Sequence, residues 1–74
     1  MNEAETRMNE EFMNAFTEVT GTVINIIGKV PGGYIGELSD RRVLIYEEEV
    51  KDFPTSSGSQ QREMVENIKG RPSV

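Results

Sequence analysis

The sequence predicts a mainly β fold of the α+β class: a small, strongly bent antiparallel sheet with an amphipathic helix before it and a short helix after it. Residues 19–53 are a run of β-branched and aromatic segments separated by glycine, proline and Ser-Asp turns. Residues 3–18 repeat apolar side chains at spacings of three and four, the period of a helix. Gly70 and Pro72 end a second, shorter helical pattern.

The first helix is expected over residues 3–18, with Met8, Phe12 and Phe16 on its apolar stripe. A helix of this length is marginal alone in water, so the stripe must dock on something. The sheet of the same chain is one partner, and a second copy of the chain is the other. Two phenylalanines and a methionine are a large apolar load beside so small a sheet. Met8, Phe12 and Phe16 are therefore the candidate oligomerisation residues.

The sheet is expected to contain about four or five strands bounded by turn residues. The first, over 22–27, has apolar residues on both faces, which is typical of a strand covered on both sides. A glycine-rich loop over 28–33, strands over 34–38 and 43–46, a helical turn over 47–50 and a closing strand over 50–53 follow. Pro54 ends the closing strand.

These elements predict one small domain over residues 1–54, made of the helix 3–18 and a β core over 19–54. Residues 55–59 have the serine and glycine composition of a flexible linker. A short C-terminal helix over 60–70 follows, and residues 71–74 are a tail. Because this helix is short and polar, we expect it to dock only in an assembly or to fray.

The chain has 74 residues and contains neither cysteine nor histidine. Disulfides, Cys/His zinc sites and a histidine general base are therefore excluded. Its serines and threonines have no histidine to activate them, so we predict no enzyme, no catalytic residue, no metal and no cofactor. Because a core this small supplies little stability, we expect a homo-oligomer.

The formal net charge is −5, and acidic residues concentrate in the first helix and after residue 46. This charge argues against sequence-independent binding to phosphate backbones, which depends on lysine and arginine. No apolar run approaches the length of a membrane span, and no basic region precedes an apolar one at the N-terminus. We expect a cytoplasmic protein.

Three segments carry a resemblance to a known group: residues 11–16, 33–40 and 46–53. In their order and turn positions they resemble the SH3-like small barrels, and within these the Sm-like group. The resemblance implies a barrel with an N-terminal helix, assembly into rings through edge strands, and RNA binding. The closing segment has Glu47-Glu48-Glu49-Val50 where that group has a basic-glycine pair. No RNA-binding residue can therefore be carried over.

The acidic residues Glu47, Glu48, Glu49 and Asp52 are the candidate protein-binding residues. Such a charge run is a solvated surface, a patch for a protein partner, or a carboxylate metal site; three consecutive acids point in different directions and so suit a metal poorly. The leading hypothesis is a small regulatory or inhibitory protein that binds another macromolecule through this surface. Small acidic accessory proteins of bacteria or their phages have this size and composition.

The alternative hypothesis uses the basic residues of the sheet region, Lys29, Arg41 and Arg42, with Tyr34 as a stacking face. If the loop at 28–33 folds over the turn at 39–42, these residues line a site for a nucleotide or single-stranded nucleic acid. Otherwise Arg41 and Arg42 are solvated turn residues paired with neighbouring acids.

Overall fold

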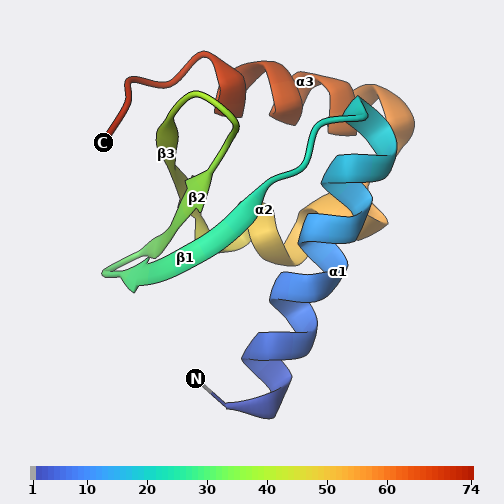
Figure 1. The fold of residues 1–74 in the computed structure, drawn as a ribbon. Coiled ribbons are helices and arrows are strands. Elements are labelled where there is room, and N and C mark those ends of the chain that lie inside the picture. Colours follow the sequence, from blue (N-terminus) through green and yellow to red (C-terminus); the bar gives the residue numbers. More distant parts are fainter. Residues whose placement is uncertain (1) are drawn as a thin grey trace.

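A computed structural model describes residues 2–74 and has an α+β fold, which confirms the α+β class. The predicted mainly β character is wrong, because the described helices hold more residues than the strands do. The elements are α1 (Glu3–Thr20), β1 (Asn25–Val30), β2 (Gly33–Glu37), β3 (Arg42–Tyr46), α2 (Glu47–Asp52), the 3₁₀ helix η1 (Phe53–Thr55) and α3 (Gly58–Lys69). Within these residues the sheet has three strands in the antiparallel order β1-β2-β3, and not the predicted four or five. In Figure 1, α3 runs across the ends of α1 and of the sheet. An SH3-like barrel is not shown by this open sheet and stays a prediction.

Helix α1 begins and ends close to the predicted 3–18. The side chain of Asn2 accepts a hydrogen bond from the backbone N–H of Glu5 at 2.8 Å and caps the first turn. At the other end Gly21 takes a φ of 71°, the left-handed conformation that closes many helices. None of the helices in residues 2–74 is both long and apolar enough to cross a membrane.

Strand β1 begins and ends three residues later than the first strand predicted over 22–27. Pro31 and Gly32 form a two-residue turn in which Gly32 has a φ of 84°, as a type II turn requires. Because pairing runs back from this turn, Gly28 lies inside β1 and the predicted loop over 28–33 is wrong. The register is Asn25↔Glu37, Ile26↔Gly36, Gly28↔Ile35, Lys29↔Tyr34 and Val30↔Gly33.

The predicted closing strand over 50–53 is also wrong, because the chain is helical there. The Glu49 carboxylate accepts a hydrogen bond from the backbone N–H of Tyr46 at 2.9 Å, which fixes the first turn of α2. Three acids in this turn also suit the positive end of the helix dipole. The linker is shorter than the predicted 55–59, since Ser57 caps α3 and the helix begins at Gly58.

Three phenylalanines join α1 to η1. The ring centroids of Phe12 and Phe53 lie 5.5 Å apart, and those of Phe16 and Phe53 lie 6.0 Å apart. The rest of the buried apolar core comes from the face of the sheet that carries Tyr34 and Val43, here called the inner face, and from α2, α3 and the connecting loops. Its other members are Ile24, Leu38, Ile45, Val50, Val65 and Ile68. The C-terminal helix therefore docks within the chain, contrary to the expectation.

Tyr34 is a buried residue whose hydroxyl has no hydrogen-bond partner among residues 2–74. Its ring fills the inner face, but a buried hydroxyl without a partner costs about 1–3 kcal/mol. We expect Tyr34→Phe to leave the free energy of unfolding unchanged or to raise it by about 1 kcal/mol in urea titrations. Tyr46→Phe is the control, because that side chain is half exposed. A loss of more than about 1 kcal/mol in Tyr34→Phe would show that the hydroxyl is bonded.

Candidate functional site

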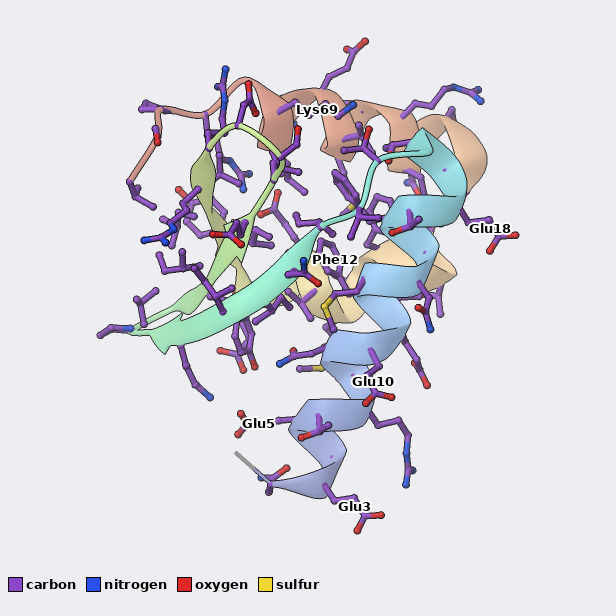
Figure 2. The ribbon with its side chains drawn as sticks, in the orientation of Figure 1. Glu3, Glu5, Glu10, Phe12, Glu18 and Lys69 are labelled. Carbon is purple, nitrogen blue, oxygen red and sulfur yellow. The ribbon has the colours of Figure 1, made fainter. Side chains whose placement is uncertain are left out.

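Only three of the four acidic residues predicted to bind a protein are exposed. Glu47, Glu48 and Asp52 are exposed on α2, as expected of residues that meet a partner. Glu49 is not, because its carboxylate pairs with Arg71 inside the chain. Glu3, Glu10 and Glu18 of α1 are also exposed and point away from the sheet (Figure 2). No group of three or more acidic side chains in the described residues is arranged to hold a metal ion.

The predicted oligomerisation stripe lies in the core of its own chain. Phe12 and Phe16 are fully buried, and Phe12 points into the space between α1 and the sheet (Figure 2). Met8 is half-buried and packs against the same cluster. The proposed contact of Phe12 and Phe16 with a second copy is therefore wrong, since the sheet and η1 already cover them.

The basic and aromatic residues of the alternative hypothesis fall into two groups: the Lys29 ammonium lies 5.6 Å from the centre of the Tyr34 ring, and Arg41 and Arg42 lie together at the opposite end of the sheet. Tyr34 is 1% exposed on the inner face and cannot stack on a ligand. Lys29 pairs with Glu5 at 3.3 Å, and the hydrogen bond and charge of Glu5 raise the pKa of the Lys29 ammonium. Lys29 is opposite Tyr34 beside the β1–β2 turn, whereas Arg42 lies at the other end of the sheet. The condition for this hypothesis, that residues 28–33 fold over the 39–42 turn, is not met.

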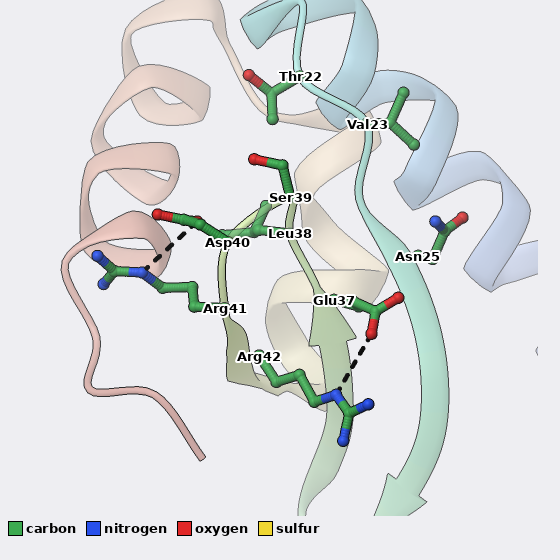
Figure 3. Close-up of a pocket in the computed structure, with 9 residues that line it drawn as sticks. All are labelled: Thr22, Val23, Asn25, Glu37, Leu38, Ser39, Asp40, Arg41 and Arg42. Atoms are coloured by element: carbon green, nitrogen blue, oxygen red, sulfur yellow. Dashed lines mark hydrogen bonds and ion pairs between the residues drawn. The ribbon is translucent and has the colours of Figure 1, made fainter.

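An open groove of about 750 Å³ lies beside the β2–β3 turn (Figure 3). Its two arginines already have acidic partners. Arg42 Nε lies 3.3 Å from Glu37 Oε2, and Arg41 Nε lies 3.9 Å from Asp40 Oδ1. Arg41 also donates hydrogen bonds to the backbone carbonyls of Lys69 and Arg71, and so holds the end of α3. The groove therefore offers an anionic ligand little uncompensated positive charge. The other lining residues are Thr22, Val23, Asn25, Leu38 and Ser39.

Sequence reasoning missed a doubly hydrogen-bonded, mostly buried ion pair, which belongs to the tail. The Arg71 guanidinium donates to both carboxylate oxygens of Glu49, at 2.7 and 2.5 Å, and to the backbone carbonyl of Leu44 at 2.9 Å. It also lies 4.7 Å from the centre of the Tyr46 ring. The side chains of Arg71 and Glu49 are only 19% and 14% exposed. The hydrogen bond between Arg71 and Glu49 and the negative charge of Glu49 raise the pKa of the Arg71 guanidinium.

The face of the sheet that points away from the core, here called the outer face, carries apolar side chains. Ile35 and Leu44 are paired neighbours on it and are half-buried, while Tyr46 is 48% exposed. Val30 lies on the same face and is also half-buried. Because all the buried apolar residues of the strands point inward, this face has no packed layer of its own within residues 2–74.

Gly28 leaves a gap in the outer face, because it stands opposite Ile35 without a side chain. Ile27 bulges out of the ladder beside it and is 47% exposed. Gly28 does not have a positive φ, and an added Cβ would meet nothing within 4 Å. Nothing in the described part of the chain therefore requires a glycine at this position.

No family model, no curated protein and no solved structure matches the chain. The resemblance of residues 11–54 to the Sm-like group stays a prediction. Function is therefore inferred from the Arg71–Glu49 contact, the outer face and the paired charges around the groove.

The Arg71–Glu49 pair is expected to stabilise the fold, because both groups are mostly buried and doubly hydrogen bonded. Arg71→Met and Glu49→Gln should each lower the free energy of unfolding by about 2 kcal/mol. In a double-mutant cycle the double variant should lose at least about 1 kcal/mol less than the sum of the two single losses. Arg42→Met is the control, since its exposed pair with Glu37 should contribute less than about 0.5 kcal/mol. Fully additive losses in urea titrations would contradict the coupling.

Proposed function

We propose that the chain is a small, non-enzymatic regulatory or inhibitory protein that acts through protein–protein contact, as a homo-oligomer whose subunits meet at the outer face of the sheet. The observation that carries the proposal is Gly28. A glycine inside a strand weakens it, by roughly 0.5–1 kcal/mol relative to alanine. It is usual where a bulge needs a positive φ, or where another backbone or a ligand approaches closely.

The bulge at Ile27 does not account for this glycine, because Gly28 has no positive φ and no near neighbour. Gly33 is different. A Cβ there would collide with the backbone carbonyl oxygen of Ile45, so the fold itself requires Gly33. A close approach from outside the chain remains the reason for Gly28.

The apolar character of the outer face favours a protein as the occupant. Ile35 is paired with Gly28, Val30 lies two residues along the same strand, and Leu44 and Tyr46 lie on the same face of β3. All four side chains remain partly exposed. An apolar centre with polar groups at its margin is the usual composition of a protein interface. Glu37 and Arg42 supply such a margin at the β2–β3 end of the face.

The charges at this margin favour a second copy of the chain over an unrelated partner. The chain as a whole carries −5, so two copies repel each other at most surfaces. On the outer face, however, Glu37 and Arg42 stand side by side, 3.3 Å apart. In a twofold contact the same patch meets itself, and each Arg42 can then face the Glu37 of the other copy. The exposed Glu47, Glu48 and Asp52 of α2 stay available to a regulated partner.

A side chain placed at Gly28 tests the proposal without harming the fold. Gly28→Gln should weaken self-association at least about tenfold, because the new side chain holds the partner away. The isolated subunit should be no less stable, since glycine is a poor strand residue. Sedimentation velocity up to about 100 µM measures the mass, because a micromolar Kd then gives mostly dimer.

Gly58→Gln is the matched control, because Gly58 is exposed at the start of α3 and has room for a Cβ. It should associate like the wild type. Two results would contradict the proposal: a wild-type chain that sediments only as the 8.3 kDa monomer, or a Gly28→Gln variant that associates like the wild type.

A further inference from the structure

The tail after α3 occupies a site that fits a guanidinium group. The Glu49 carboxylate supplies a two-oxygen acceptor, the carbonyl of Leu44 a third acceptor, and the Tyr46 ring a stacking face. Glu49 is held in place by its own bond to the backbone N–H of Tyr46. A planar guanidinium satisfies all three groups together, whereas the ammonium group of lysine cannot bind in this bidentate, stacked way.

The same tail covers an edge of the sheet. Strand β3 pairs with β2 on one side only, so its other edge presents backbone groups to any extended chain. The backbone N–H of Val74 donates a hydrogen bond to the carbonyl of Arg42 at 2.8 Å. The Arg71 side chain donates to the carbonyl of Leu44, which lies two residues further along the same edge. The tail thus fills the place of a fourth strand with one backbone hydrogen bond to β3 and the Arg71 side chain, while Arg41 holds the start of the tail through the carbonyl of Arg71.

The geometry points to a peptide-binding site at the β3 edge, which takes an extended segment of a partner protein with an arginine and a free backbone N–H three residues after it. The chain's own tail occupies this site as an intramolecular ligand. Main-chain bonds to a strand edge with one side-chain pocket are a common means of peptide recognition. Because a tethered tail competes at a high effective concentration, a partner segment must displace it before it binds.

This site differs from the outer-face contact but shares one residue with it. It uses Glu49, the edge carbonyls of β3 and the Tyr46 ring, which also lies on the outer face, whereas the proposed contact between copies centres on Gly28 of β1. The proposal also gives Glu49 a binding role of a kind different from the one expected for an exposed acidic patch. Glu49 would recognise a partner's arginine from inside the pocket that Arg71 now fills.

Peptide titration into the full chain tests the inference. Arg71→Ala empties the guanidinium pocket, and acetylated peptides Gly-Arg-Pro-Ser-Val and Gly-Lys-Pro-Ser-Val are the probes. The arginine peptide should bind the variant by calorimetry at least about tenfold more tightly than the lysine peptide does. The wild-type chain should bind it more weakly than the variant, because its own tail competes. Arg71→Ala combined with Glu49→Gln should lose the preference for arginine.

Equal binding of the two peptides, or no saturable binding to Arg71→Ala, would overturn the inference. If Arg71→Ala does not fold, the same titration into the wild-type chain, followed by amide NMR, decides the question. The arginine peptide should then shift the amide signals of Leu44 and Tyr46, and no shift there would overturn the inference. If the wild-type chain forms a dimer and Arg71→Ala does not, the occupant of the β3 edge is the tail of a second copy. This result would overturn the choice of a different partner protein.

Discussion

The contact of Phe12 and Phe16 in α1 with Phe53 in η1 is the constraint on which the rest of this structure depends. It fixes α1 against the segment that follows the sheet, and in doing so places the longest helix over the inner face. A chain with no disulfide and no metal ligand of the Cys/His type has few other means to stabilise so small a core. The fully buried apolar side chains of the strands therefore all lie on one side of the sheet, and the outer face keeps its half-buried apolar side chains.

The tail covers the free edge of strand β3. Strand β3 would end the sheet with open backbone groups, and Arg71 and Val74 satisfy two of them. Arg71 also neutralises Glu49, the most buried acid of α2, so the acidic run after β3 is compatible with close packing. The edge of β3 is therefore covered by the tail, whereas on the outer face only the Tyr46 ring has a stacked partner, Arg71, among the described residues. The regulation through protein contact that we propose would use this uncovered part of the face.

Much of the fold could be predicted from the sequence because the signals were local. The period of Met8, Phe12 and Phe16 and the stop at Gly21 define α1. The first strand was misplaced because Gly28 looked like a loop residue, and only its pairing with Ile35 shows that it is not. The closing strand failed because Glu49 caps a helix there. The Arg71 pocket could not be predicted, since Arg71 and Glu49 lie 22 residues apart in sequence and no local pattern connects them.

The central claim is that the outer face binds a second copy of itself, and exchange of its charges measures this most directly. A Glu37→Arg chain has two positive groups at the margin of this face, and an Arg42→Glu chain has two negative ones. Each variant alone should stay monomeric at concentrations where the wild type associates, because like charges then meet across the twofold axis. An equimolar mixture should associate again, seen by native mass spectrometry as a heterodimer of the two masses. A mixture that stays monomeric, or single variants that associate like the wild type, would contradict the claim.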